Sequence, residues 1–194
     1  MKKKLKKLAI LASGNGTTLQ AIIDAIKNKE LDSSIKIVIS NTSDAYALER
    51  AKASKIKTYV LKDYKDEDEL YKVLKEADID LVVLAGYLKL IPVKVIREFT
   101  IVNTHPALLP KFGGKGMYGM NVHRAVVEAG EKVTGATLHF VNEEYDKGKI
   151  IAQTKVKVYK KGTAEDVSAR VQAAEKIQIV KVLNDFANGL IDIP

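Results

Sequence analysis

A length of 194 residues suits one domain with a sizeable core, and a composition of 46% hydrophobic and 29% charged residues is ordinary for a globular protein. The chain has no cysteine, which excludes disulfides and thiolate metal sites, and its apolar runs are too short to span a bilayer. A formal net charge of +8 favours an anionic ligand, either a nucleic acid or a phosphorylated metabolite. The basic start, Met1 to Lys4, is not followed by the apolar core of a signal peptide, so we expect a cytoplasmic protein.

Strand-like and helix-like segments alternate through the first hundred residues. Short apolar or β-branched runs predict strands at residues 8–12, 35–40, 59–61 and 81–85. Amphipathic segments between and after them predict helices at residues 19–29, 44–55, 66–77 and 92–98. Asp44 is expected to cap the second helix, and Asp66 or Asp68 the third.

The pattern changes after a predicted strand at residues 101–104. Residues 106–120 hold two prolines and four glycines and predict an irregular loop, in which Leu109–Pro110 is a candidate for a cis peptide. A helix at residues 122–129 precedes two strands, at 134–141 and 150–159, that are expected to pair as a hairpin. A last helix is predicted at residues 163–188, with these apolar residues facing inward: Val167, Val171, Ala174, Ile177 and Val180.

This order of segments predicts an α/β fold. We expect a single domain over residues 1–194, with a mostly parallel, doubly wound (Rossmann-like) sheet. The last two strands are expected to form an antiparallel edge hairpin.

Two polar side chains mark the end of the strand at residues 101–104. Asn103 and His105 are two residues apart, so in extended backbone their side chains point the same way. An amide donor can hold a developing oxyanion, and an imidazole can move protons near neutral pH. Ligands of open α/β sheets gather at such strand ends, which favours a catalytic site here.

A glycine turn, Ser13 to Thr18, joins the first strand to the first helix. Its glycines allow a tight turn, and the free N–H groups at a helix start attract an anion, although a plain strand-to-helix turn explains the pattern about as well. Leu19 replaces the third glycine of a dinucleotide fingerprint, and the lysine of a P-loop is absent. The turn therefore favours a single phosphate over NAD or ATP.

The other histidines and the carboxylates are less distinctive. His123 is interpreted as surface or loop support, and His139, in the middle of a strand, as structural. A histidine poised for proton transfer usually needs an orienting carboxylate. Asp146 is the best placed acid, because Gly148 can let its polar turn fold back; the alternative is a solvated hairpin tip.

Together, these stretches resemble the folate-dependent glycinamide ribonucleotide formyltransferase family. Four segments match its motifs in order, and a fifth, residues 169–175, continues the match over nearly the whole chain. The four are Ser13 to Gln20, Val82 to Lys89, Asn103 to Pro110, and His139 through Asp146 to Gly148. The Asn103, His105 and Pro106 element with the later Asp146 is specific to formyl-folate enzymes as a group.

The resemblance implies a reaction and its catalytic residues. The formyl group of 10-formyltetrahydrofolate, the co-substrate, would pass to the primary amine of glycinamide ribonucleotide in purine biosynthesis. His105 would be the acid and base, Asn103 would hold the formyl oxygen, and Asp146 would orient and stabilise charged His105, raising its pKa. The alternative acceptors are water, as in formyltetrahydrofolate hydrolase, and charged tRNA, as in methionyl-tRNA formyltransferase.

The resemblance also implies binding positions. The phosphate loop falls on Gly16, Thr17 and Thr18, and further substrate contacts on Gln172 and Glu175. The folate-binding positions are Leu88, Lys89, Leu90, Ile91 and Asn103, with the turn Asn142, Glu143, Glu144, Tyr145 and Asp146. Residues 1–100 would form the phosphate and substrate side, and residues 101–194 the catalytic and folate side. Core packing explains the apolar residues equally well, and an exposed helix face explains Gln172 and Glu175.

Further expectations concern partners. No metal is expected, and the partners are expected to be small molecules, with neither nucleic acid nor membrane, for a monomer or homodimer. The chain ends after one predicted domain, whereas the tRNA enzyme carries a further domain and the hydrolase a preceding one. A rival of another class is a non-catalytic, RNA-associated module, which only the charge of +8 suggests.

Overall fold

The computed structural model describes residues 4–193, so Met1, Lys2 and Lys3 of the basic start lie outside the described residues. The chain divides into two compact units. The first unit comprises Met1–Val102 and Val180–Pro194, and the second comprises Asn103–Ile179.

The first unit is built from strands that alternate with helices. The strands are β1 (Lys7–Leu11), β2 (Ser34–Ser40), β3 (Thr58–Val60) and β4 (Leu81–Leu84). The helices are α1 (Thr17–Lys27), α2 (Tyr46–Ala53), α3 (Glu67–Glu76) and α4 (Val93–Glu98). All eight predicted segments are confirmed, and every end lies within two residues of its predicted position.

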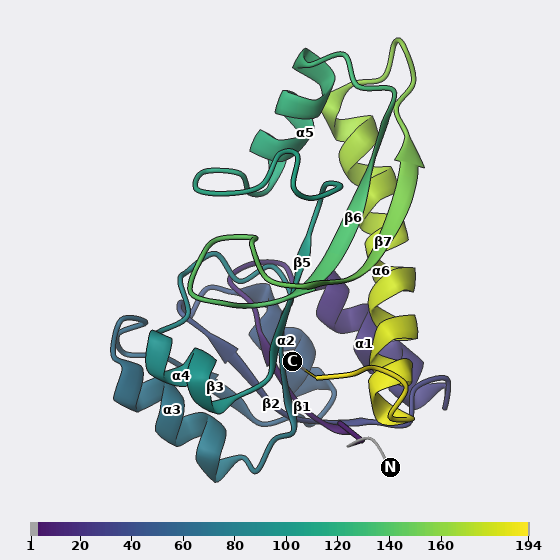
Figure 1. The fold of residues 1–194 in the computed structure, drawn as a ribbon. Helices are drawn as coiled ribbons and strands as arrows, with labels where there is room; N and C mark the ends of the chain where they lie inside the picture. The colour runs from purple at the N-terminus through teal and green to yellow at the C-terminus, as the bar shows by residue number, and fades with distance from the viewer. Residues whose placement is uncertain (1–3, 194) are drawn as a thin grey trace. The chain divides into compact units, whose positions relative to one another are not determined.

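The strand pairs of this unit are parallel. β1 pairs with β2 and with β4, and β2 pairs with β3. The chain thus moves from β1 out to β3 and then returns to the other side of β1. Because parallel crossovers are right-handed, this reversal places α1 and α2 on one face of the strands and α3 on the other. The helix contacts agree, since α1 packs against α2 and α3 against α4 (Figure 1).

The predicted helix caps had different outcomes. Asp66 caps α3, because its carboxylate accepts hydrogen bonds from the N–H groups of Asp68 at 2.9 Å and Glu69 at 3.1 Å. The prediction for Asp44 is wrong. The residue before α2 is Ala45, in extended backbone and without a side-chain cap, so Asp44 lies one position too early.

The second unit begins within β5 (Ile101–His105) and is dominated by a hairpin. It also contains α5 (Met120–Glu128), β6 (Val133–Phe140), β7 (Ile150–Lys157) and most of α6 (Ala164–Ala187). β6 and β7 pair antiparallel, from Val133 opposite Lys157 to His139 opposite Ile150, so the predicted hairpin is confirmed. The Leu109–Pro110 peptide is cis.

The inward face of α6 departs from the prediction at one position. Val167 and Val171 are fully buried and pack with Val126 of α5 and Ala136 of β6, whereas Ile177 is 74% exposed. Six residues after Val171 an α-helix has turned roughly 120° away from the starting direction. The buried face therefore continues at the residues after Ile177.

The strands follow the order β3-β2-β1-β4-β5-β6-β7 in one sheet. With parallel pairs among β1 to β4 and an antiparallel β6–β7 edge, the predicted α/β class is confirmed. None of the helices in residues 4–193 has the length and apolar composition of a membrane span.

The cap of α3 gives a testable prediction. Asp66→Ala removes the acceptor of two N–H groups, so we expect it to lower the free energy of unfolding by about 1 kcal/mol. Asp66→Asn keeps an acceptor and should lose less. Asp68→Ala, which removes an exposed ion pair with Lys94 and a first-turn charge but leaves the Asp66 cap in place, is the matched control. Urea denaturation measures all three; equal losses for Asp66→Ala and Asp68→Ala would contradict the assignment of the cap.

Candidate active site

The end of β5 presents its side chains alternately to two groups of residues. The Asn103 amide lies 3.2 Å from Nε2 of His139, and His105 lies beside Asp146, with 3.5 Å between Nδ1 and Oδ2. Thr104, between them, donates its hydroxyl to Glu175 of α6 instead. Asn103 and His105 therefore contact one continuous set of polar groups, as their spacing of two residues predicts.

Asp146 is brought to His105 by the backbone of the turn after β6. Asp146 has a φ of 55°, in the left-handed region, and an added Cβ on Gly148 would lie 1.7 Å from the Phe140 carbonyl oxygen. The turn can pass this closely only with glycine at 148. The Asp146 side chain is 13% exposed, and its carboxylate also accepts a hydrogen bond from the Gly114 N–H at 2.9 Å. The alternative of a solvated hairpin tip does not describe Asp146.

His139 joins Asn103 to Asp146, a connection that the sequence interpretation missed. Its Nδ1 lies 2.8 Å from the Phe140 carbonyl, which can only accept, so Nδ1 carries a proton. In the neutral ring, Nε2 accepts from the Asn103 amide; when the ring is charged, Nε2 also carries a proton and donates to Oδ1 of Asp146, 3.5 Å away. A histidine in mid-strand has no local sequence signal for such a role.

Burial and charge oppose each other at the acid–base pair. Burial lowers the pKa of His105, and although the Asp146 carboxylate and the Phe112 carbonyl raise it, the net shift is downward. Asp146 thus acts in the predicted direction but is outweighed. Burial alone would raise the pKa of Asp146. Hydrogen bonds from His139 and the Gly114 N–H, with the charges of the two histidines, hold it below its ordinary value.

The third histidine is not on the surface. His123, on α5, is 2% exposed, and within the described residues its Nδ1 has no hydrogen-bond partner. Burial lowers its pKa, and the charge of His105 lowers it further. The surface interpretation of His123 is therefore wrong, because the helical stripe of α5 turns it inward with Val122 and Val126.

In the first unit, the glycine turn ends in a helix start with free donors. Gly16 precedes α1 with a φ of 74°, and an added Cβ would lie 2.7 Å from the Cβ of Ala47, so glycine is required. No side chain caps α1, and no acidic residue lies in its first turn. Thr17 and Thr18 are half-buried there. Such a helix start is suited to an anion.

Two residues that the sequence did not single out brace this turn. Arg50 donates to the carbonyl of Asn15 at 2.8 Å and to its side-chain oxygen at 2.7 Å. Ser13 donates to Asn41 at 2.5 Å and accepts the Leu88 N–H at 2.9 Å. These contacts hold the predicted phosphate loop and the start of the folate-binding segment in one arrangement within the first unit.

The predicted folate-binding segment of this unit is partly exposed. Leu88 is 57% and Leu90 55% exposed, whereas Ile91 is 6% exposed. Core packing thus accounts for Ile91 but not for the two leucines. The ammonium of Lys89 lies 4.7 Å from the ring centre of Tyr64.

The remaining predicted positions lie in the second unit. In the turn after β6, the Asn142 side chain accepts the Glu144 N–H at 3.1 Å, and Tyr145 is 47% exposed; Glu143 also lies in this exposed turn. On α6, Gln172 is exposed and donates to Ser168 at 3.1 Å. Burial raises the pKa of Glu175, despite the Thr104 hydroxyl. Among residues 4–193 there is no group of three or more His, Asp or Glu arranged for a metal ion.

The comparisons with known proteins agree with this fold. The sequence profile described as formyl transferase matches residues 6–183, so the chain belongs to the formyl transferase family. A solved structure of glycinamide ribonucleotide transformylase 1 from Symbiobacterium toebii superposes with a TM-score of 0.90 at 35% identity, over 98% of this chain and 91% of that one.

Two curated relatives are phosphoribosylglycinamide formyltransferases. The protein from Haemophilus influenzae is 39% identical over 95% of this chain and 89% of its own length. The chloroplastic protein from Arabidopsis thaliana is 41% identical over 92% of this chain, which spans only 64% of the plant protein. The resemblance seen in the sequence is confirmed by these relatives.

The half-buried Glu175 gives a prediction for stability. Because its pKa is raised in the folded state, folding takes up protons, and stability is lost as pH rises from the ordinary value of 4.5 through the folded value. Glu175→Gln should therefore raise the melting temperature at neutral and alkaline pH and not below pH 4.5. Thermal unfolding across this range tests the claim, and a variant less stable than the parent at alkaline pH would refute it.

Proposed function

We propose that this chain transfers the formyl group of 10-formyltetrahydrofolate to the primary amine of glycinamide ribonucleotide in purine biosynthesis, giving formylglycinamide ribonucleotide and tetrahydrofolate. The observation that carries the proposal is the buried series of polar contacts from Asn103 through His139 and Asp146 to His105. The family, and the activity printed in the names of its relatives, support the same reaction.

The proposed chemistry divides among three side chains. As the amine attacks the formyl carbon, the formyl oxygen gains negative charge, and an amide N–H of Asn103 is suited to stabilise it. His105 takes up the proton that the amine loses and supplies one to the departing folate nitrogen. Ionised Asp146 stabilises His105 while it is charged, which a buried imidazole requires.

The proposed binding residues keep their predicted assignments. Gly16, Thr17 and Thr18 bind the phosphate, which the uncapped start of α1 supports. Gln172 and Glu175 contact the rest of the acceptor. The Glu175 carboxylate pairs with the ammonium or amide end of the acceptor. Folate contacts come from residues 88–91, Asn103 and residues 142–146, and the exposed leucines of the first segment support apolar contact with a ring.

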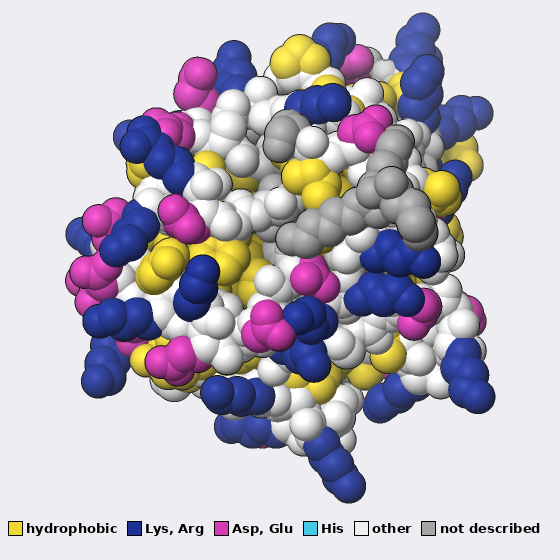
Figure 2. Space-filling view, turned by 60° about the horizontal axis from the view of Figure 1, so that its bottom comes forward, with side chains coloured by type: hydrophobic (Ala, Val, Ile, Leu, Met, Phe, Trp, Pro, Cys, Tyr) yellow, Lys and Arg dark blue, Asp and Glu magenta, His cyan; other side chains and the backbone are white. Residues whose placement is uncertain are grey.

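We further propose one formyltransferase domain over residues 1–194, with residues 1–100 serving the phosphate side and residues 101–194 the catalytic side. It acts on small molecules in the cytoplasm as a monomer or homodimer, with neither a metal nor a nucleic acid or membrane partner. On the face shown in Figure 2, Lys and Arg side chains are dispersed among Asp and Glu instead of gathered in one patch, which favours this choice over an RNA-associated module.

The experiment that tests the function compares formyl acceptors. Purified protein is given 10-formyltetrahydrofolate with glycinamide ribonucleotide, with water alone or with charged tRNA, and product formation is followed. We expect transfer to glycinamide ribonucleotide, and His105→Ala should lower kcat by roughly 100-fold or more with an unchanged melting temperature. Preferred transfer to tRNA or water would reject the acceptor, and wild-type rates in His105→Ala would reject the role of His105.

A second prediction concerns the pH dependence of the rate. The Asp146 charge raises the pKa of His105, so Asp146→Asn should lower that pKa and move the corresponding limb of the pH–rate profile to lower pH. The rate itself should fall because charged His105 loses its partner. Steady-state kinetics over a pH series measure both effects, and a lower rate with an unmoved profile would remove Asp146 from the scheme.

A further inference from the structure

His105 and Asp146 are both held by one short stretch of the loop that follows β5. This stretch, here called the bridge segment, consists of Phe112, Gly113 and Gly114. Nε2 of His105 lies 2.8 Å from the Phe112 carbonyl oxygen, and the Gly114 N–H donates to Oδ2 of Asp146 at 2.9 Å. One backbone segment thus contacts both members of the proposed acid–base pair.

The first contact determines where His105 carries its proton. A carbonyl oxygen can only accept a hydrogen bond, so Nε2 must be the donor. In neutral His105 the other nitrogen, Nδ1, is then unprotonated and faces the Asp146 carboxylate at 3.5 Å. Protonation of Nδ1 converts this unfavourable approach into an ion pair, so Nδ1 is the nitrogen whose proton can be gained and lost.

We propose that the bridge segment is a positioning element, in which the Phe112 carbonyl fixes the neutral His105 tautomer with its proton on Nε2 and the Gly114 N–H orients Asp146 toward Nδ1. The proton exchanged in the reaction is then the one on Nδ1. The catalytic consequence rests on the proposed function, whereas the tautomer is a property of the protein without substrate.

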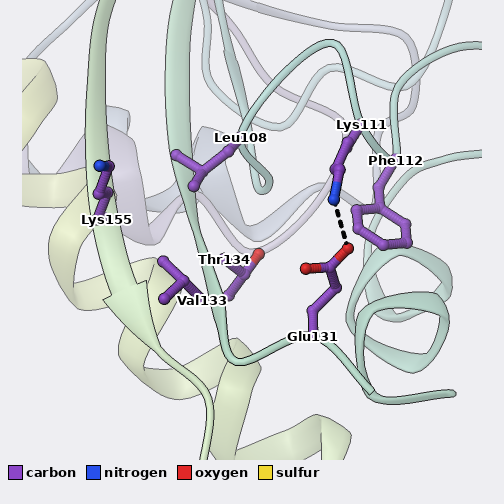
Figure 3. A pocket seen from close by; sticks show the side chains of 7 residues that line it. All are labelled: Leu108, Lys111, Phe112, Glu131, Val133, Thr134 and Lys155. Carbon is purple, nitrogen blue, oxygen red and sulfur yellow. Dashed lines mark hydrogen bonds and ion pairs between the residues drawn. The ribbon is translucent and has the colours of Figure 1, made fainter. Parts of the chain in front are cut away.

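The conformation of the bridge segment indicates that it is held in place. Phe112 has a φ of 56°, which is unfavourable for a residue with a large side chain. Its ring is fixed by packing against the buried cluster around Val126 and Val171. Beside it, the Lys111 ammonium pairs with Glu131 at 2.8 Å, and Phe112 lies next to this pair along a cavity of ≈ 340 Å³ (Figure 3).

The glycines allow the segment to approach Asp146. An added Cβ on Gly113 would lie 3.3 Å from the Cβ of Asp146 and 2.5 Å from Cδ2 of Leu109. A side chain at 113 would therefore push the segment away from the carboxylate. Gly114 donates its N–H to Asp146 while its φ is 97°, a conformation that other residues rarely adopt.

The test of the tautomer uses the protein without substrate. Histidine-selective ¹⁵N and ¹³C labelling with NMR at a pH where His105 is neutral reports which ring nitrogen carries the proton. The titratable groups that act on His105 are Asp146, His139 and His123, so the His105 signals are assigned with the His105→Ala variant and followed through the titration. We expect the Nε2–H form. The Nδ1–H form would overturn the proposal whether or not the protein transfers formyl groups.

The test of Gly114 uses a matched pair of variants. Gly114 and Gly116 both have positive φ values, 97° and 87°, and an added Cβ at either meets no atom within 4 Å. Gly114→Ala and Gly116→Ala therefore introduce comparable backbone strain, but only the first disturbs the hydrogen bond to Asp146.

Gly114→Ala should lower the melting temperature at least as much as Gly116→Ala, and the two variants should differ in kinetics. We expect Gly114→Ala to lower kcat roughly tenfold and to move the acid limb of the pH–rate profile to higher pH, because the N–H no longer stabilises ionised Asp146. Gly116→Ala should stay within about twofold of the parent with an unchanged profile. Equal rates and equal profiles in the two variants would overturn the role of Gly114.

Discussion

A carboxylate buried between two imidazoles is the constraint on which the second unit depends. Burial favours the neutral form of Asp146, and only fixed donors keep the ionised form stable there. The donors are the Gly114 N–H in the loop after β5 and, when its ring is charged, Nε2 of His139 on β6. The left-handed backbone of Asp146 and the glycine at 148 follow from this requirement, because without them the carboxylate could not reach its partners.

In the first unit, the proposed phosphate site is formed by backbone N–H groups at the start of α1. A helix start with no capping side chain and no acidic residue in its first turn leaves N–H groups for an anion. Arg50 and Ser13 satisfy neighbouring carbonyl and amide groups, so the turn is held without consuming those donors. In the second unit, by contrast, Glu175 lowers stability: burial raises its pKa, so its charged form destabilises the folded state. Glu175 is one of the residues proposed to contact the acceptor, and a loss of stability at a binding residue is a common cost of function.

The positions of the helices and strands and the α/β class are confirmed, whereas the burial of individual helix residues is predicted less well. The positions of β5 and of the hairpin strands follow from apolar runs and turn residues, and the shared direction of Asn103 and His105 follows from the strand period. The burial of His123 and the exposure of Ile177 depend on how a helix packs, which a single stripe does not determine. The Phe112 carbonyl carries no sequence signal, because every residue has one.

The residues proposed to act on the formyl carbon are different from those proposed to contact the rest of the acceptor. The same catalytic residues can therefore serve several related reactions. An amide donor, an imidazole and a carboxylate serve any nucleophile that attacks a formyl carbon, so they do not distinguish an amine on a phosphorylated sugar from water or tRNA. Discrimination must come from groups that contact the acceptor away from its reacting atom. In this chain the proposed groups are the uncapped start of α1 and Glu175. The proposed acceptor contacts would therefore decide which nucleophile is used, while Asn103, His105 and Asp146 would carry out the transfer itself.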